Sequence, residues 1–207
     1  EGRCTMEIKI KEKKPMPLFQ KIFYIISFVF LIWAFIYLGT KNYNAPIKKL
    51  SDAESFTKEF GITSDNRFKY KNAKETLELL NTGTGVIFFS FPENEWSYNY
   101  AEMLNDVTKD NNEEFIYYYN FKNDRSNKNY YYTNIVKILE SYVPTTDAGD
   151  KNIYAPSVVF VKDGNIIGYD DETSIMKGDT SVSNYWTNEK IINKKVSFDI
   201  MFKKLRS

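Results

Sequence analysis

The sequence predicts an α/β domain, a mixed sheet flanked by helices, preceded by one N-terminal transmembrane helix. Three observations predict it. Residues 22–39 form an apolar run without a charge. Beyond residue 66, short apolar runs with the length of strands alternate with stretches whose apolar residues recur at helical spacing. Later, Asp163-Gly164 separates two apolar runs, which is the strongest short signal for a β-hairpin.

The apolar run "IFYIISFVFLIWAFIYLG" (22–39) lies between Lys21 and Lys41. As a helix it would span roughly 27 Å, close to the hydrocarbon thickness of a bilayer. A buried core helix would show a polar face, and this run has none. A cleavable signal peptide is the alternative, but its apolar region is usually about 7–15 residues long and ends at a small-residue cleavage site. We therefore expect an uncleaved membrane anchor.

The lysines around this run set its expected direction. Five lysines precede it within residues 6–21, against three in the first stretch beyond it. Positive residues stay on the cytoplasmic side of a membrane. Residues 6–21 are therefore expected to form a cytoplasmic basic segment, and the C-terminal part to lie outside the cell. The chain is predicted to be a single-pass protein of the cell membrane.

Composition excludes several classes of function. The formal charge of the 207 residues is +1, which gives no basic field for nucleic acid. There is no histidine, so a Ser-His-Asp triad and a His-ligated zinc site are excluded. The single cysteine, Cys4, falls in "EGRCT" (1–5), which has the form of a cleavage-tag remnant before a native start at Met6. We expect no disulfide, no metal and no cofactor.

The segment after the anchor, residues 40–65, reads as a linker with one short helix. Ser51 and Glu54 have the S-x-x-E form of a capping box, and Gly61 is a natural stop for a helix. These signals predict a helix at residues 52–60.

The domain expected at residues 66–207 begins with an alternating run, "RFKYK" (67–71), which indicates a strand. Asn72 then caps a helix that ends near Gly83. The run "GVIFFSF" (85–91) is almost continuously apolar, as expected of a central strand that is buried on both faces.

The same order then repeats. A helix is expected at residues 95–109 from a cap at Asn94, then a strand at 114–121 and a helix at 128–142. In the first of these helices we expect an at least partly buried face, formed by Trp96, Tyr100, Met103, Leu104 and Val107.

The hairpin and one more helix close the domain. "SVVFV" and "NIIGY" are its two antiparallel strands, and a helix follows at residues 187–205. Its apolar residues at helical spacing are Ile191, Ile192, Val196, Ile200, Met201 and Leu205. Between the two, the acidic run at residues 170–172 could bind a cation, but it lacks an alternating oxygen-ligand loop and is predicted to be a solvated turn.

Two segments resemble thioredoxin-like domains. "GVIFFSFPENEWS" is similar to the strand-turn-helix of that family, in which F-F-x-x-P-x-C-P-x-C is common, with Asn94 and Ser97 in place of the cysteines. "YAPSVVFVKDGNIIG" is similar to the family's cis-proline segment, with Pro156 before the strand. The resemblance covers about residues 66–175. Within the family, the chain looks like the bacteriocin transport accessory proteins of Gram-positive bacteria.

The chemistry of the resembled family requires groups that this chain lacks. Thiol-disulfide exchange needs a thiolate at a helix N-terminus and a second thiol that resolves the mixed disulfide. Asn94 cannot ionise, and the hydroxyl of Ser97 has no comparable acidity. The buried aspartate found in many thioredoxins is replaced by Phe88. The domain is therefore expected not to be an enzyme of this kind.

What the resemblance still implies is a groove for a protein or peptide partner. An extended segment would lie between the turn at Asn94, Glu95, Trp96 and Ser97 and the loop at Tyr154, Ala155 and Pro156. Trp96 would form one wall if exposed, although it could instead pack inward, and Asn94 could be a helix cap only.

These expectations give one main function and two alternatives. The main one is a redox-inactive binding protein outside the membrane that recruits or assembles an envelope or secreted partner. The first alternative is a secretion-accessory or immunity protein for an exported peptide. The second is an enzyme with non-thiol chemistry through Ser97 or Glu95, which lacks a base to activate the serine.

Overall fold

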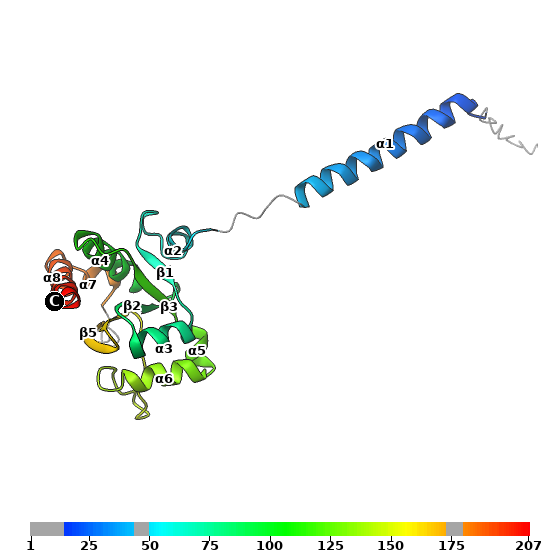
Figure 1. Ribbon diagram of the computed structural model, residues 1–207. Helices are drawn as coiled ribbons and strands as arrows, with labels where there is room; N and C mark the ends of the chain where they lie inside the picture. Colours follow the sequence, from blue (N-terminus) through cyan, green and yellow to red (C-terminus); the bar gives the residue numbers. More distant parts are fainter. Residues whose placement is uncertain (1–14, 44–49, 173–179) are drawn as a thin grey trace, which may run out of the picture. The chain divides into compact units, whose positions relative to one another are not determined.

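The computed structural model describes residues 15–43, 50–172 and 180–207 (Figure 1). It divides into two compact units, residues 1–49 and 50–207. The predicted tag remnant and most of the basic segment lie outside the described residues, as does part of the linker.

The first unit contains the helix α1, Leu18–Tyr43. Within it, Leu18–Leu38 is long and apolar enough to cross a membrane, and no part of this stretch is buried in the protein. The helix thus extends beyond the apolar run at 22–39 at both ends. A helix of this length and composition is consistent with a single-pass anchor or with a signal sequence.

The second unit is an α/β domain. Its strands are β1 (Phe68–Tyr70), β2 (Gly85–Ser90), β3 (Ile116–Asn120), β4 (Ser157–Lys162) and β5 (Asn165–Asp171). Its helices are α2 (Asp52–Phe60), α3 (Ala73–Thr82), α4 (Ser97–Asp110), α5 (Lys122–Ser126), α6 (Tyr130–Ile138), α7 (Val182–Tyr185) and α8 (Asn188–Arg206).

The five strands form one mixed sheet in the order β1-β3-β2-β4-β5. The first three are parallel, while β4 is antiparallel to both β2 and β5. Asp163 and Gly164 both have positive φ in the tight turn between β4 and β5, as the hairpin signal predicts. The mixed sheet flanked by helices is confirmed.

Helices cover both faces of the sheet (Figure 1). In β2, Val86 and Phe88 enter the core on one face, whereas Ile87 and Phe89 enter the core on the other. The first core is completed by side chains of α2, α4 and α8, and the second by side chains of α3 and α6. This two-sided burial explains why β2 lacks polar alternation.

Helices α2 and α3 begin where the capping residues of the sequence predict. The predicted capping box forms at Ser51 with Glu54, and the predicted cap Asn72 also forms a capping box, with Glu75. The compact unit begins at Leu50 and therefore includes α2, which we had grouped with the linker. The reason is packing, since Phe56 of α2 is fully buried in the first core.

Other boundaries differ from the predictions. The helix α4 begins at Ser97 rather than at residue 95, and the stretch 128–142 contains only α6, which ends at Ile138. Two short helices, α5 and α7, were not predicted. Each is too short for a periodic apolar pattern, and none of their residues is fully buried.

The apolar residues of the last helix divide between two faces. Its buried residues are Phe198, Phe202 and Leu205. Ile192, Val196 and Ile200, which stand in the apolar pattern of the sequence, are exposed to solvent instead. The helix is apolar on two sides, so periodicity alone could not say which side meets the sheet.

Candidate functional site

The turn between β2 and α4 lies beside the start of β4. Phe89 of β2 pairs with Ser157 of β4, so the end of one strand is next to the beginning of the other. Backbone hydrogen bonds shape the turn, from the Asn94 N–H to the Phe91 carbonyl and from the Ser97 N–H to the Asn94 carbonyl, both at 3.1 Å. Strand pairing therefore brings together two segments that are about sixty residues apart, as the resemblance implied.

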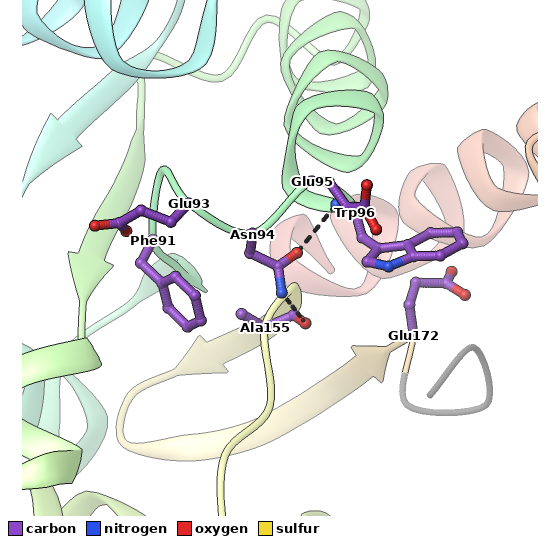
Figure 2. Close-up of a pocket in the computed structure, with 7 residues that line it drawn as sticks. All are labelled: Phe91, Glu93, Asn94, Glu95, Trp96, Ala155 and Glu172. Atoms are coloured by element: carbon purple, nitrogen blue, oxygen red, sulfur yellow. Dashed lines mark hydrogen bonds between the residues drawn. The ribbon is translucent and has the colours of Figure 1, made fainter. Parts of the chain in front are cut away.

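The Asn94 side chain connects these two segments (Figure 2). Its Nδ2 donates to the carbonyl oxygen of Ala155 at 3.1 Å. Its Oδ1 accepts from the Trp96 N–H at 3.1 Å and from the Ser97 hydroxyl at 3.0 Å. The peptide bond between Ala155 and Pro156 is cis.

Asn94 does not cap α4 in the way we expected. The N-cap position is Trp96, which makes no side-chain cap hydrogen bond. The amide of Asn94 instead closes a small turn onto the N–H two residues later, which Asn side chains do readily. The Asn94 side chain therefore has a structural role: it holds the turn against the Ala155 loop, and it does not cap the helix.

A pocket of about 390 Å³ opens at this junction. Figure 2 shows Phe91 on one side of Asn94, with Trp96 and Glu172 on the other. The residues that line it are Phe91, Glu93, Asn94, Glu95, Trp96, Ala155 and Glu172.

The structure brings together only part of the predicted partner-binding set. Four predicted residues line the pocket, namely Asn94, Glu95, Trp96 and Ala155. Three do not, namely Ser97, Tyr154 and Pro156. Ser97 is fully buried, and Pro156 is buried as well. Tyr154 is half-buried outside the pocket.

Trp96 is neither a free surface residue nor a core residue. It is half-buried, and its ring makes an edge-to-face contact with Tyr185 of α7 at a centroid distance of 5.5 Å. This geometry suits the electrostatics of aromatic rings. The unpredicted helix α7 thus supports the indole from one side, while another part of the side chain lines the pocket.

Glu172 is the main site residue that sequence reasoning missed. It directly follows β5 and is only 5% exposed. Its Oε1 lies 2.6 Å from Lys194 Nζ, and its Oε2 accepts from the Tyr185 hydroxyl at 2.8 Å. The acidic run at 170–172 is therefore not a solvated turn.

Glu172 belongs to a charged cluster, which we define as Asp170, Glu172, Lys194 and Tyr100. Lys194 Nζ lies 2.8 Å from Asp170 Oδ1, and the Tyr100 hydroxyl donates to the same oxygen at 2.6 Å. The side chains of Lys194 and Asp170 are each 17% exposed. The cluster joins β5 and the residue after it to α4 and α8 beside the pocket.

The environment shifts the pKa values of this cluster. Burial, and then the Asp170 carboxylate, raise the pKa of Tyr100 well above its ordinary value. Burial alone would lower the pKa of Lys194, but the carboxylates of Asp170 and Glu172 outweigh it and raise that pKa. Tyr100 therefore stays a hydrogen-bond donor and Lys194 stays charged around neutral pH.

The site contains no activated nucleophile among the described residues. The Ser97 hydroxyl accepts a hydrogen bond from Ser90 and donates to Asn94, and neither partner is a base. Within the residues that the structure describes, no group of three or more His, Cys, Asp or Glu side chains is placed to hold a metal ion. The pocket offers aromatic surface, carboxylates and backbone groups.

Comparison of the chain with models of known protein families and with curated proteins finds no match. Function is therefore inferred from the turn, the pocket and the charged cluster themselves.

Proposed function

We propose that this chain is a membrane-anchored, redox-inactive thioredoxin-like protein that binds a protein or peptide partner on the outer face of a bacterial membrane. The observation that carries the proposal is the pocket between the turn and the Ala155 loop, with Asn94 joining the two segments. The partner is an envelope or secreted protein that the domain recruits or helps to assemble. A secretion-accessory or immunity role would be a special case of the same binding.

The backbone beside the pocket suits an extended segment. The Ala155 carbonyl accepts from Asn94, whereas no described residue accepts a hydrogen bond from the Ala155 N–H. Strand-like pairing needs only such main-chain groups, and side-chain pockets supply the choice of partner. A segment that presents a carbonyl oxygen to this N–H would lie along the pocket, with Trp96 and Phe91 as its apolar walls.

The anchor and its direction support the envelope location. The helix α1 has the length and apolar composition of a membrane span, and lysines are denser before it than after it. Protease added to intact spheroplasts is expected to digest the part after residue 41. Full protection of that part would reverse the proposed orientation.

The test of the site uses Trp96. A photo-crosslinking amino acid at position 96 of the full chain should capture the partner in living cells, while the same group at Tyr130 should not. Tyr130 is 72% exposed on α6 and serves as the matched control. Binding of the identified partner is then measured by calorimetry with purified protein.

Trp96→Ala is expected to weaken that binding about thirty-fold, because a partly buried indole is a typical anchor of an interface. Loss of the Tyr185 contact should lower the unfolding free energy by only about 1 kcal/mol. Tyr130→Ala should change neither quantity. Unchanged affinity in Trp96→Ala would show that the partner docks elsewhere, and a melting temperature many degrees lower would make Trp96 a core residue.

A further inference from the structure

The outer face of α8 carries a row of apolar side chains that nothing in the described domain covers. Ile192, Val196 and Ile200 are 60%, 52% and 50% exposed. Single exposed apolar residues are common, but these three recur every four residues on one helix. The opposite face of α8 packs against the sheet, and the helix lies at the outside of the domain beside α4 (Figure 1).

Charged residues continue this row at both ends. Glu189 stands three residues before Ile192, and Lys203 stands three residues after Ile200. At about 100° per residue, all five side chains fall within an arc of roughly 80° around the helix. We call Glu189, Ile192, Val196, Ile200 and Lys203 the outer row.

The outer row has the same spacing in both directions from Val196. Its intervals are three, four, four and three residues, and its two ends carry opposite charges. A row of this kind is complementary to itself when turned end for end. That property is what a two-fold, isologous contact requires. If residue i of one copy contacts residue j of the other, then residue j of the first copy contacts residue i of the second.

We propose that the outer row binds the outer row of a second copy of this chain, with the two α8 helices antiparallel and a two-fold axis at Val196. Val196 then meets the partner's Val196, and Ile192 meets the partner's Ile200. At each end Glu189 lies opposite the partner's Lys203. A parallel pair would place Glu189 against the partner's Glu189 and Lys203 against the partner's Lys203, and like charges exclude it.

The charges of the separate chain are compatible with this pairing. Glu189 is exposed and makes no ion pair with any described residue of its own chain. Lys203 is paired with Asp199 one turn away, at 2.5 Å. In the dimer, Lys203 would lie between Asp199 and the partner's Glu189, so each end of the contact keeps its charges matched.

A lipid surface is the other occupant to consider. Helices that lie on membranes carry mainly Lys and Arg beside their apolar face. Helix α8 has six such residues against two acidic ones, but within the outer row Glu189 balances Lys203, which is the arrangement that a second copy matches and a lipid surface does not. The row is also small against a stable interface, which buries about 800 Å² on each partner. The contact should therefore be weak for the free domain and stronger when two anchored copies share one membrane.

Cysteine crosslinking of the full chain in lipid vesicles tests this geometry. In a Cys4→Ser background, Val196→Cys should form a disulfide-linked dimer on mild oxidation. Ile192→Cys alone and Ile200→Cys alone should not, whereas a mixture of those two chains should. Thr133→Cys, exposed on α6, is the control and should remain monomeric.

Charge reversal provides a second, independent readout. Glu189→Lys or Lys203→Glu should each lower crosslinking of Val196→Cys about fivefold, because surface ion pairs are individually weak. The two reversals together should restore it. Dimers from Ile192→Cys alone would indicate a parallel pair and overturn the proposal. Absence of any Val196→Cys dimer, with a fluorophore at position 196 quenched by lipid-attached quenchers, would assign the row to the bilayer.

Discussion

Two polar networks meet at the pocket, and they are built from different groups. The turn at residues 91–97 is joined to the Ala155 loop by hydrogen bonds of neutral groups, centred on Asn94. The charged cluster next to it joins α4, α8 and the end of β5 through Lys194 and two carboxylates. One network positions backbone at the pocket, and the other ties three elements together below it.

The two networks should differ in how much stability is lost when one of their side chains is substituted. A neutral hydrogen bond contributes about 1 kcal/mol net, and water can replace it where the groups are partly exposed. A buried charge that loses its partner has no such substitute. A change in the turn should therefore cost less stability than a change in the cluster, which has to keep its partners together. Three predictions follow this order, from the largest effect to the smallest.

Lys194→Met should have the largest effect on stability. It leaves Asp170 and Glu172 together without a cation, with Glu172 only 5% exposed. We expect the unfolding free energy to fall by about 3 kcal/mol. For a domain of this size the melting temperature would fall by about 6 to 12 °C. Thermal unfolding followed by circular dichroism measures it.

Lys195→Met is the matched control on the same helix. Lys195 pairs with Asp106 at 2.7 Å, and the two side chains are 36% and 44% exposed, against 17% for Lys194 and Asp170. Its loss should cost no more than about 0.5 kcal/mol. Equal effects of the two substitutions would mean that the charged cluster is no more important than a surface pair.

Asn94→Ala should have an intermediate effect. It removes the bond to Ala155 and both bonds that Oδ1 accepts, with an expected cost of about 1–2 kcal/mol in urea unfolding. Asn94→Asp keeps an acceptor for the Trp96 N–H but replaces the donor to Ala155 by a second oxygen. Both variants lose the bond to Ala155, so the difference between them reports the bonds that Oδ1 accepts. The loss of the bond to Ala155 is read from Asn94→Asp compared with the unsubstituted chain. A loss as large as that of Lys194→Met would contradict the distinction between the two networks.

Glu93→Gln should have the smallest effect. Glu93 lines the pocket and pairs with Lys122 at 2.9 Å, and that lysine lowers the pKa of Glu93. Both side chains are well exposed, so water and salt screen the pair. We expect no measurable change in the melting temperature at physiological ionic strength. A clear fall would show that the turn depends on charge after all.

Local signals in the sequence were enough for most of the fold. The capping boxes at Ser51 and Asn72 and the hairpin at Asp163-Gly164 act over three or four residues, and each forms where the sequence indicates. The apolar run of β2 indicated a central strand, because a strand covered on both faces needs no polar side. Within the site, the meeting of Asn94 and Ala155 was expected only from the resemblance to thioredoxin-like domains, because local signals do not say which strands pair.

The rest depended on contacts between distant residues. The acidic run at residues 170–172 gave no sign of Lys194, since pairing between residues more than twenty positions apart leaves no periodic pattern. The helix α7 was missed because four residues are too few for a helical period. Its Tyr185 nevertheless makes the edge-to-face contact with Trp96.

The sequence by itself determined the apolar span, the succession of the five strands and the longer helices along the chain, and the absence of a thiol in the turn, because residue type, short-range spacing and charge are written along the chain. Only the tertiary structure decided that Ser97 and Pro156 are buried, that Glu172 lines the pocket, and that Ile192, Val196 and Ile200 face solvent. The physical reason is that burial depends on which elements meet. A helix with apolar residues on two sides can satisfy its own pattern with either side inward, and only packing against the sheet selects one.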